Sequence, residues 1–286
     1  MIGATLLFGS IGIFVRAIPL ASSVIALARA MVGSLVLLAA ALLRRRPVDA
    51  AAVRRALPLL IFSGACIGVN WILLFEAYRY TSVGVATLAY YAAPVLVLLL
   101  SPLVLRERLT LARGLGVALA AGGTLLLTGG SAGAGSDPLR GILLGLGAAA
   151  FYAAVVLTNK FITGLDGLPR TLIQLAAAGA VLAPYVLLTR PAPTGPMTAA
   201  AFACLAAVCL VHTGFGYWLY FSAMGELSGQ TTALLGYLDP LSALVFAALF
   251  LGERMGALQL AGAALILGGA ALGELWQGRK TSGGAA

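Results

Sequence analysis

Charged and titratable side chains inside the long apolar runs of this sequence are the residues best placed to do chemistry. Asp239 and Glu76 each put a carboxyl group within a run, where a charged side chain costs roughly 2.5–3.5 kcal/mol at a helix centre. Either carboxyl could carry a proton or act as the counter-charge of a substrate amine, and Asp239 could instead make a structural hydrogen bond. His212, the only histidine, is a candidate substrate-binding residue that could be a neutral hydrogen-bonded ring or a titrating group.

Two cationic side chains also lie in or beside apolar runs. Arg29 and Lys160 could bind a carboxylate, and Asn159 and Gln174 could hydrogen-bond it. The alternative for both cations is that their long stems reach the lipid headgroups. We take Asn159 and Lys160 as candidate substrate-binding residues and leave the role of Arg29 open.

Tyrosine and tryptophan side chains recur deep inside the runs, whereas lipid-facing aromatic residues usually gather at the membrane interfaces. Buried O–H and N–H groups need partners, which favours an aromatic-lined cavity, with ordinary interior packing as the alternative. Tyr78 lies near the end of its run and also fits an interfacial belt. The predicted cavity residues are Trp71, Tyr78, Tyr90, Tyr91, Tyr217, Trp218 and Tyr237.

Two prolines interrupt apolar runs at equivalent places. Pro94 and Pro240 each follow a tyrosine, Tyr91 or Tyr237, by one helical turn. Proline removes a backbone hydrogen bond and kinks a helix, and in lipid the freed carbonyl must be satisfied by protein or water. The pair predicts two gating bends, with simple packing kinks as the alternative.

Signatures of enzymes are missing from the sequence. It contains no G-x-x-x-x-G-K-[ST] phosphate loop, no H-E-x-x-H and no G-x-S-x-G. The three cysteines, Cys66, Cys204 and Cys209, lie in apolar runs without metal-ligand spacing. We therefore expect no catalytic activity, no metal and no cofactor.

The composition indicates what must position these residues. The chain is 61% hydrophobic and only 9% charged, whereas a soluble domain carries roughly 25% charged residues. The apolar runs are continuous, so lipid-spanning helices fit them and alternating barrel strands do not. The net charge of +9 resides in loops and at helix ends, which argues for membrane topology and against a nucleic-acid partner.

Ten spans of about 17–25 residues each can be drawn along the chain. A Gly- and Ser-rich linker at 130–138 separates a first five-helix unit, 1–129, from a second, 139–286. The expected fold is all-α and polytopic. The spans run over residues 2–18, 23–43, 57–78, 83–105, 111–128, 139–162, 168–188, 197–223, 228–251 and 257–276.

Residues 68–123 of the first unit recur in the second at a constant offset of 146 positions. Five spans per unit is an odd number, so the second unit must be inverted relative to the first, as in many secondary transporters. The turns at 106–108 and 252–254 both carry Glu-Arg and predict structural charge pairs. The matching pairs include Gly68 and Gly214, Phe75 and Phe221, Tyr91 and Tyr237, Pro94 and Pro240, Glu107 and Glu253, and Gly123 and Gly269.

Lys and Arg set the orientation, because cytoplasmic loops are enriched in them. With the N-terminus inside, the inner loops hold most of the 18 basic residues. Both termini are therefore expected in the cytoplasm of a bacterium, with the chain in the inner membrane.

The sequence resembles the EamA-type branch of the drug/metabolite transporter superfamily. The resemblance rests on Phe8-Gly9, Arg29, Y-Y-A-A-P-V at residues 90–95, R-E-R-L-T at 106–110 and the repeated Y-L-D-P and G-E-R of the second unit. The chain departs from the pattern with Tyr152 and Gln174 in the second unit.

The resemblance implies alternating access around a central cavity lined by the first, third, fourth, sixth, eighth and ninth spans. It further implies export of amino acids, including aromatic ones, and of related metabolites, most like the bacterial aromatic amino-acid exporters. Proton-coupled efflux of cationic drugs is the alternative, because aromatic walls also attract cations. The expected partners are a small-molecule substrate and the lipid bilayer, around a monomer.

Overall fold

The computed structural model describes residues 1–44, 49–105, 111–130, 135–224, 227 and 235–282. Over these residues the chain is helical and contains no strand, as the composition predicts. The helices are α1 (Ile2–Arg16), α2 (Ser22–Arg44), α3 (Ala50–Tyr80), α4 (Val83–Tyr90), α5 (Ala93–Val104), α6 (Leu111–Gly130), α7 (Pro138–Asn159), α8 (Gly167–Thr189), α9 (Ala199–Ala206), η1 (Ala207–Phe215), α10 (Gly216–Met224), α12 (Leu238–Leu251) and α13 (Ala257–Ser282).

Many of these helices are apolar enough to lie in a membrane. Within the described residues, six helical segments are long and apolar enough to cross it: Ser22–Leu43, Ala50–Tyr80, Val83–Val104, Pro138–Asn159, Gly167–Thr189 and Ala199–Ala223. Shorter apolar helices are Ile2–Arg16, Gly114–Gly130, Leu238–Leu251 and Ala257–Leu272. Large apolar side chains such as Leu43 and Leu188, each 84% exposed, point out of the bundle, which suits contact with lipid.

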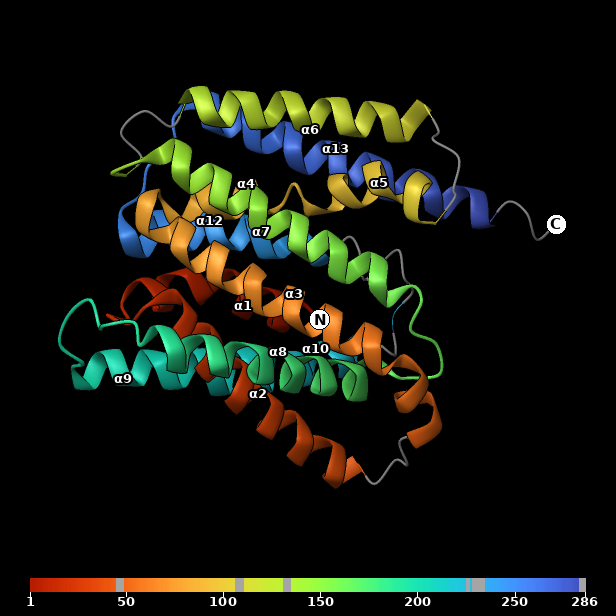
Figure 1. Ribbon diagram of the computed structural model, residues 1–286. Coiled ribbons are helices and arrows are strands. Elements are labelled where there is room, and N and C mark those ends of the chain that lie inside the picture. The colour runs from red at the N-terminus through yellow and green to blue at the C-terminus, as the bar shows by residue number, and fades with distance from the viewer. Residues whose placement is uncertain (45–48, 106–110, 131–134, 225–226, 228–234, 283–286) are drawn as a thin grey trace.

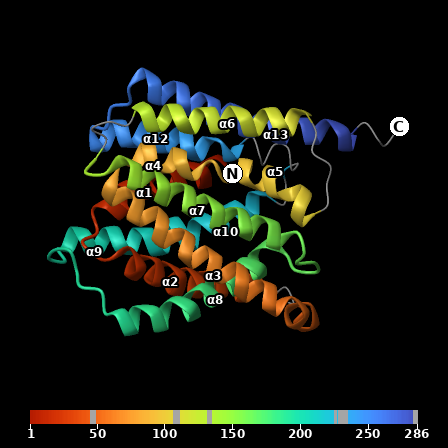
Figure 2. The same cartoon turned by 45° about the horizontal axis from the view of Figure 1, so that its top comes forward.

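The helices form a bundle with two distinct edges. Figures 1 and 2 show α6 beside α13 at one edge and α2 with α8 at the other. Between the edges, α1 packs on α12, α7 packs on α3, α4 and α5, and α2 packs on η1. Helices that are far apart in sequence therefore build the interior together.

Glycines set the close approach of α6 and α13. A Cβ on Gly123 would lie 2.6 Å from the carbonyl oxygen of Gly262, and one on Gly262 would lie 2.7 Å from that of Gly123. A Cβ on Gly269 would lie 2.6 Å from the carbonyl oxygen of Gly116. Small residues let the two backbones touch, the usual basis of tight helix packing in lipid.

The fourth predicted span, 83–105, is two helices rather than one kinked helix. Helix α4 ends at Tyr90 and α5 begins at Ala93, so Pro94 lies in the first turn of α5. A proline there loses nothing, because the first N–H groups of a helix have no intrahelical partner. The expected bend at Pro94 is thus a break one turn earlier, at Tyr91 and Ala92. Pro240 likewise lies in the first turn of α12.

Two predicted boundaries are wrong, and a third is not tested. Helix α3 begins at Ala50, because Asp49 caps it by accepting a hydrogen bond from the Ala51 N–H, so Arg54 and Arg55 are helical rather than in a loop. Helix α13 continues to Ser282, well into the stretch expected to be a polar tail. Much of the start of the ninth span, at 228–234, lies outside the described residues.

The eighth predicted span contains a π-helical segment, η1, between α9 and α10. Its register shows in the side chains of His212 and Thr213, which bond the carbonyls of Ala207 and Val208, five residues earlier. Such segments are rare and are frequent at functional sites. The sequence analysis predicted a regular helix here.

Several connections gather at one end of the bundle. The N–H of Asp137 donates to the carbonyl of Tyr80 at 3.1 Å, and that of Thr194 donates to the carbonyl of Pro19 at 3.0 Å. The first bond joins the end of α3 to the residue before α7. The second joins the turn after α1 to the connection between α8 and α9. The alternating path expected of a multi-pass chain puts these connections on one side of the membrane.

Candidate substrate site

The structure gathers five of the predicted aromatic residues into one cluster. Trp71 and Tyr78 are buried there, 5% and 3% exposed, and Tyr90, Tyr217 and Trp218 pack against the same cluster. These residues come from α3, α4 and α10, so both halves of the chain supply them. These side chains pack together within a hydrophobic core, and we take this aromatic cluster as the candidate site.

Arg29 is buried against this aromatic cluster and does not extend to the surface of the bundle. It is 5% exposed, and its guanidinium carbon stands 4.0 Å from the centre of the Trp71 ring and 5.7 Å from that of Phe75. Nε donates to the hydroxyl of Thr213 at 2.7 Å. Stacking on an aromatic face is a geometry that guanidinium favours. Helix α2 therefore delivers a cation to the interior.

The π-helix explains why Thr213 can accept this bond. Its hydroxyl donates to the carbonyl of Val208 at 2.8 Å, which commits its only proton and leaves the oxygen lone pairs free for Arg29. Gly214 follows, and a Cβ there would lie 2.6 Å from a methyl carbon of Val36, so only glycine lets α2 come this close. Thr213 could not be selected from the sequence, because its role depends on the local π-helical register, which no residue pattern predicted.

His212 is a satisfied interior histidine. Nδ1 lies 3.0 Å from the carbonyl oxygen of Ala207, and Nε2 lies 3.0 Å from the hydroxyl of Ser10. A carbonyl only accepts, so Nδ1–H is the donor to Ala207. The Ser10 hydroxyl also donates to the carbonyl of Leu7 at 2.8 Å, so its contact with Nε2 has no fixed direction. The Phe14 ring packs edge-on against the imidazole at 4.8 Å. Both ring nitrogens thus have a partner, and both alternatives for this residue remain predictions.

Asp239 joins the two halves through Tyr91. The Tyr91 hydroxyl donates to Oδ2 of Asp239 at 2.5 Å, and Asp239 lies in the first turn of α12, where the helix dipole favours a negative group. Tyr90 packs edge-on against Tyr91, with ring centres 5.7 Å apart, and in a tilted arrangement against Tyr152 at 5.6 Å. The break between α4 and α5 thus carries a hydroxyl aimed at the carboxyl group.

Three predicted site residues lie elsewhere. Asn159 accepts a 2.7 Å hydrogen bond from Gln174, whose amide also donates to Ser63 at 2.6 Å, so Asn159 belongs to a separate polar contact between α3, α7 and α8. Lys160 follows α7 and is exposed. Tyr237 packs near Val95 in a cluster between α5, α6 and α13.

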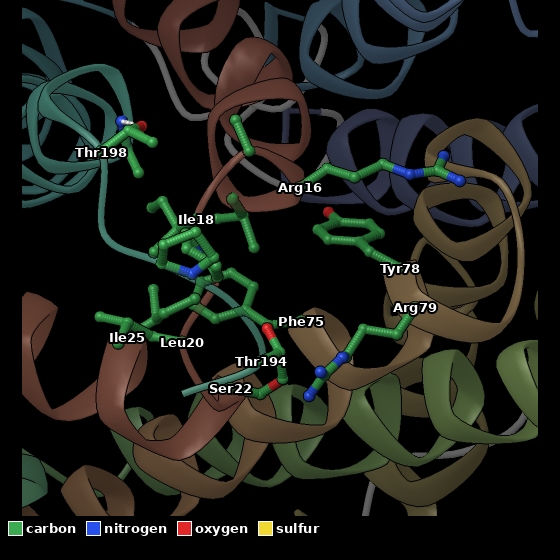
Figure 3. Close-up of a pocket in the computed structure, with 15 residues that line it drawn as sticks. Arg16, Ile18, Leu20, Ser22, Ile25, Phe75, Tyr78, Arg79, Thr194 and Thr198 are labelled. Carbon is green, nitrogen blue, oxygen red and sulfur yellow. Dashed lines mark hydrogen bonds between the residues drawn. The ribbon is translucent and has the colours of Figure 1, made fainter. Parts of the chain in front are cut away.

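A pocket of about 440 Å³, here called the vestibule, borders the cluster through Phe75 and Tyr78. Its wall includes Arg16, Ser22, Phe75, Tyr78 and Arg79, and in Figure 3 the Tyr78 ring lies between the two arginines. Phe75, which also packs beside the guanidinium of α2, separates the vestibule from the interior.

Glu76 lies near the rim of the vestibule rather than in the cluster. Its Oε2 accepts from the hydroxyl of Ser22 at 2.7 Å and from Arg79 Nη1 at 3.5 Å. The carboxylate thus has two partners, both from residues that line the vestibule.

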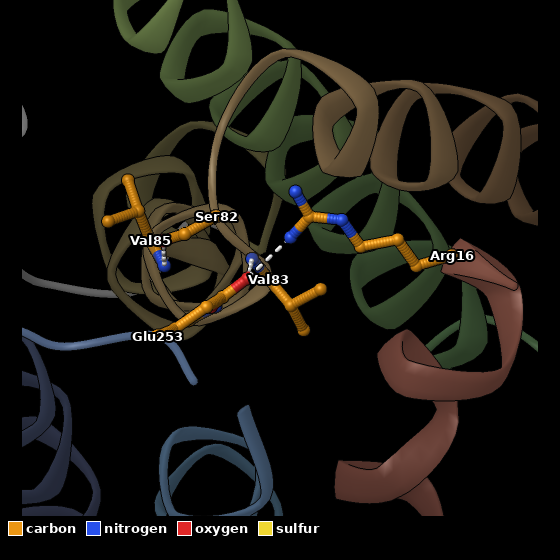
Figure 4. A network of polar contacts seen from close by, with 6 residues as sticks. Arg16, Ser82, Val83, Val85 and Glu253 are labelled. Atoms are coloured by element: carbon orange, nitrogen blue, oxygen red, sulfur yellow. Dashed lines mark hydrogen bonds and ion pairs between the residues drawn. The ribbon is translucent and has the colours of Figure 1, made fainter. Parts of the chain in front are cut away.

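Glu253 closes one end of the bundle instead of pairing within its own turn. Its carboxylate accepts from the N–H groups of Val83 and Gly84, at 2.9 and 3.0 Å, and from Arg16 Nη1 at 2.5 Å (Figure 4). It therefore caps α4 from the far end of α12, while Arg254 is exposed. The equivalent pair Glu107–Arg108 lies outside the described residues. The repeated Glu-Arg marked the turn, but its partners could not be read from the sequence.

No metal site is evident in the described part of the chain. It has no group of three or more His, Cys, Asp or Glu residues placed to hold a metal ion. Cys66, Cys204 and Cys209 are free thiols, two of them buried.

The fold and site define a multi-pass membrane protein with an aromatic interior and few charges. The sequence profile of the EamA-like transporter family matches residues 1–129 and 139–273, and the chain belongs to this family.

Two of three relatives are named as a transporter or an efflux pump. The chain is 31% identical over 205 residues to the uncharacterized transporter YxxF of Bacillus subtilis (strain 168), an alignment that covers 71% of this chain and 65% of YxxF. It is 30% identical over 211 residues to protein PecM of Dickeya dadantii (strain 3937), covering 73% of this chain and 70% of PecM. A “Probable amino-acid metabolite efflux pump” of Salmonella typhimurium (strain LT2) is 29% identical over 197 residues, covering 65% of each chain.

A solved crystal structure shares the fold. Its chain superposes with a TM-score of 0.66 at 20% identity, over 96% of this chain and 95% of the other. The likeness therefore extends over nearly the whole bundle.

Proposed function

We propose that this EamA-type transporter exports amino acids, including aromatic ones, and related metabolites across the bacterial inner membrane by alternating access. The observation that carries the proposal is the aromatic cluster around Trp71 and Tyr217, which two halves of the chain build together. An apolar side chain fits such walls, and the polar groups within them can hold its charged end. The efflux pump of Salmonella is named for amino-acid metabolites, in agreement with this substrate class.

The proposed architecture is ten spans in two inverted five-helix repeats, 1–129 and 139–286, joined by the linker 130–138. The shorter apolar helices would complete the ten. The glycine contacts support the inversion. Gly116 and Gly123 meet Gly269 and Gly262, their repeat partners in reversed order, as a two-fold axis in the membrane plane requires.

The proposed gates are the interrupted helices at Pro94 and Pro240. A helix that is already broken can change its angle without losing further backbone hydrogen bonds. We expect Pro94→Ala and Pro240→Ala, by favouring continuous helices, to slow the initial rate of substrate transport in proteoliposomes. Unchanged rates in both variants would refute the gating role.

The experiment that tests the function is uptake into proteoliposomes. Labelled phenylalanine, labelled threonine and a cationic dye are offered to purified protein, with and without a pH gradient. Saturable amino-acid uptake supports the exporter, and uptake without a gradient marks it as a facilitator. Protein-free liposomes and heat-treated protein are the controls. Absence of amino-acid uptake refutes the proposal.

The second candidate function is proton-coupled efflux of cationic drugs. The specific observation in its favour is the Asp239 carboxylate, which faces the interior from α12 beside Tyr91 and could serve as counter-charge. Glu76, near the vestibule, could play the same part. In this case Asp239→Asn and Glu76→Gln abolish drug resistance in cells, and only the dye enters liposomes, and only with a gradient.

The proposed setting is a monomer with both termini in the cytoplasm and the vestibule facing the periplasm. The basic residues near the opposite end of the bundle, such as Arg54, Arg55 and Arg170, support this orientation. A reporter fused to the C-terminus that is active only in the cytoplasm tests it.

A further inference from the structure

The guanidinium of Arg29 holds more hydrogen-bonding capacity than the protein uses. It carries five N–H donors, and among the described residues its recorded hydrogen-bond partner is Thr213 alone, through Nε. The guanidinium carbon lies 4.0 Å from the centre of the Trp71 ring, and no hydrogen bond from either Nη atom to a described residue is recorded. The side chain is nevertheless 5% exposed, in a place where unmet donors are costly.

No carboxylate of the described residues neutralises this cation. The recorded ion pairs are Arg16–Glu253 and Arg79–Glu76, and Asp239 accepts from Tyr91. A buried charge in a protein is normally paired. Because Arg29 has no recorded ion pair among the described residues, an anionic ligand could neutralise it.

The second half of the chain shows what a purely structural polar group looks like at the corresponding place. Gln174, which stands there in α8, is 2% exposed and donates to both Ser63 and Asn159. Its amide donors are used within the protein. The two halves thus differ in that only the first presents open donors.

We propose that Arg29 binds the carboxylate of the transported solute, and that the substrates are carboxylates with an apolar or aromatic body. This deepens the proposed function and rests on the aromatic cluster being the solute route. Two N–H groups of a guanidinium match two carboxylate oxygens in a bidentate pair. The cluster that surrounds Arg29 supplies contact area for the rest of the ligand.

The charges around Arg29 also set what is rejected. Asp239 is linked to the cluster through Tyr91, whose ring packs against Tyr90, so the interior holds a carboxyl group apart from the Arg29 guanidinium. A zwitterionic amino acid can meet both. A cation without a carboxylate meets the unpaired charge of Arg29 and leaves its donors unmet, so such compounds bind weakly.

The test is calorimetric binding to detergent-purified protein with three probes. These are phenylalanine, phenylalaninamide, which lacks the carboxylate, and 3-phenylpropanoate, which lacks the amine. Wild type binds the two carboxylates at least about tenfold more tightly than the amide. Arg29→Gln weakens the carboxylates by about 10- to 100-fold and changes the amide by less than about threefold.

Two further variants separate ligation from structure. Arg29→Lys keeps the charge, loses the bidentate geometry and retains part of the preference. Arg54→Gln removes an equal charge at an exposed position of α3 and leaves all three affinities as in wild type. Thermal unfolding in the same detergent shows whether each variant is folded. If Arg29→Gln does not fold, the probe preferences of Arg29→Lys decide.

The outcomes separate the subsite from the transporter. Equal weakening of the amide and the carboxylates in Arg29→Gln, or no preference in wild type, overturns the subsite while transport in liposomes can persist. An Arg29-dependent preference in a protein that moves no amino acid supports the subsite and refutes the exporter.

Discussion

Glu253 offers the sharpest single test of how this bundle closes. Its carboxylate is the acceptor for two backbone N–H groups, of Val83 and Gly84, and for the Arg16 side chain. Truncation in Glu253→Ala removes all three contacts at once. Because they link α12 to α1 and α4, we predict that the variant populates a state opened at the vestibule end.

The magnitude follows from the exposure of each contact. The loss of a side-chain cap on a helix costs about 0.5–2 kcal/mol, and Glu253 serves as such a cap for α4 although it is remote in sequence. The ion pair with Arg16, whose side chain is 42% exposed, adds at most about 1 kcal/mol because water screens it. A total of about 0.5–3 kcal/mol shifts a two-state equilibrium by about 2- to 150-fold.

The assay is the rate at which a single cysteine reacts with a membrane-impermeant maleimide. The native thiols Cys66, Cys204 and Cys209 are replaced by alanine, and Ile25→Cys serves as the reporter. Ile25 lines the vestibule and is only 2% exposed, so it reacts when that end opens. With fast opening and closing, the labelling rate scales with the open population, so Glu253→Ala should raise it by about 2- to 150-fold.

The matched control is Arg254→Ala. Arg254 is adjacent, charged and exposed, and no ion pair of it is recorded in the described region. We expect its labelling rate to equal that of wild type. A rate for folded Glu253→Ala within twofold of wild type would show that the contacts of Glu253 do not hold this end closed.

Two other perturbations test the packing and the site. Gly123→Leu should lower the thermal unfolding temperature in detergent, by overpacking worth about 1–3 kcal/mol, because its Cβ would meet a backbone carbonyl of α13 at 2.6 Å; in Gly122→Leu nothing lies within 4 Å of the new Cβ, so a loss of stability there would contradict the contact. Tyr91→Phe removes the hydrogen-bond donor to Asp239 and should lower the free energy of unfolding by about 1.5–3 kcal/mol. In an Asp239→Asn background the same substitution should lower the free energy of unfolding by clearly less. Additive losses in that double-mutant cycle would mean that the two side chains do not act on each other.

Much of the site was visible in residue types but not in residue pairs. Trp71, Tyr78, Tyr90, Tyr217 and Trp218 stood out because aromatic residues deep in apolar runs need a reason, and they do cluster. Partners across helices could not be read, because contacts between distant segments depend on helix rotation and crossing. The position of a residue along a helix does not show which neighbouring helix its side chain faces.

The helical membrane character follows from the sequence alone, and a duplication is predicted from it. Continuous apolar runs leave only helices in lipid, and repeated Gly, Pro and Tyr positions at one offset survive the bias of an apolar composition. The sequence also located the breaks near Pro94 and Pro240, since proline lacks the N–H that a helix interior requires.

The partners of the charged side chains, by contrast, depend on the tertiary structure. Arg29 could equally have reached the headgroups, and it lies on Trp71 because a π-helical register turns Thr213 toward it. Glu253 could have paired within its own turn, and it caps α4 because α12 ends beside that helix. A long charged side chain can satisfy itself in several ways at similar cost, and the surrounding helices choose among them.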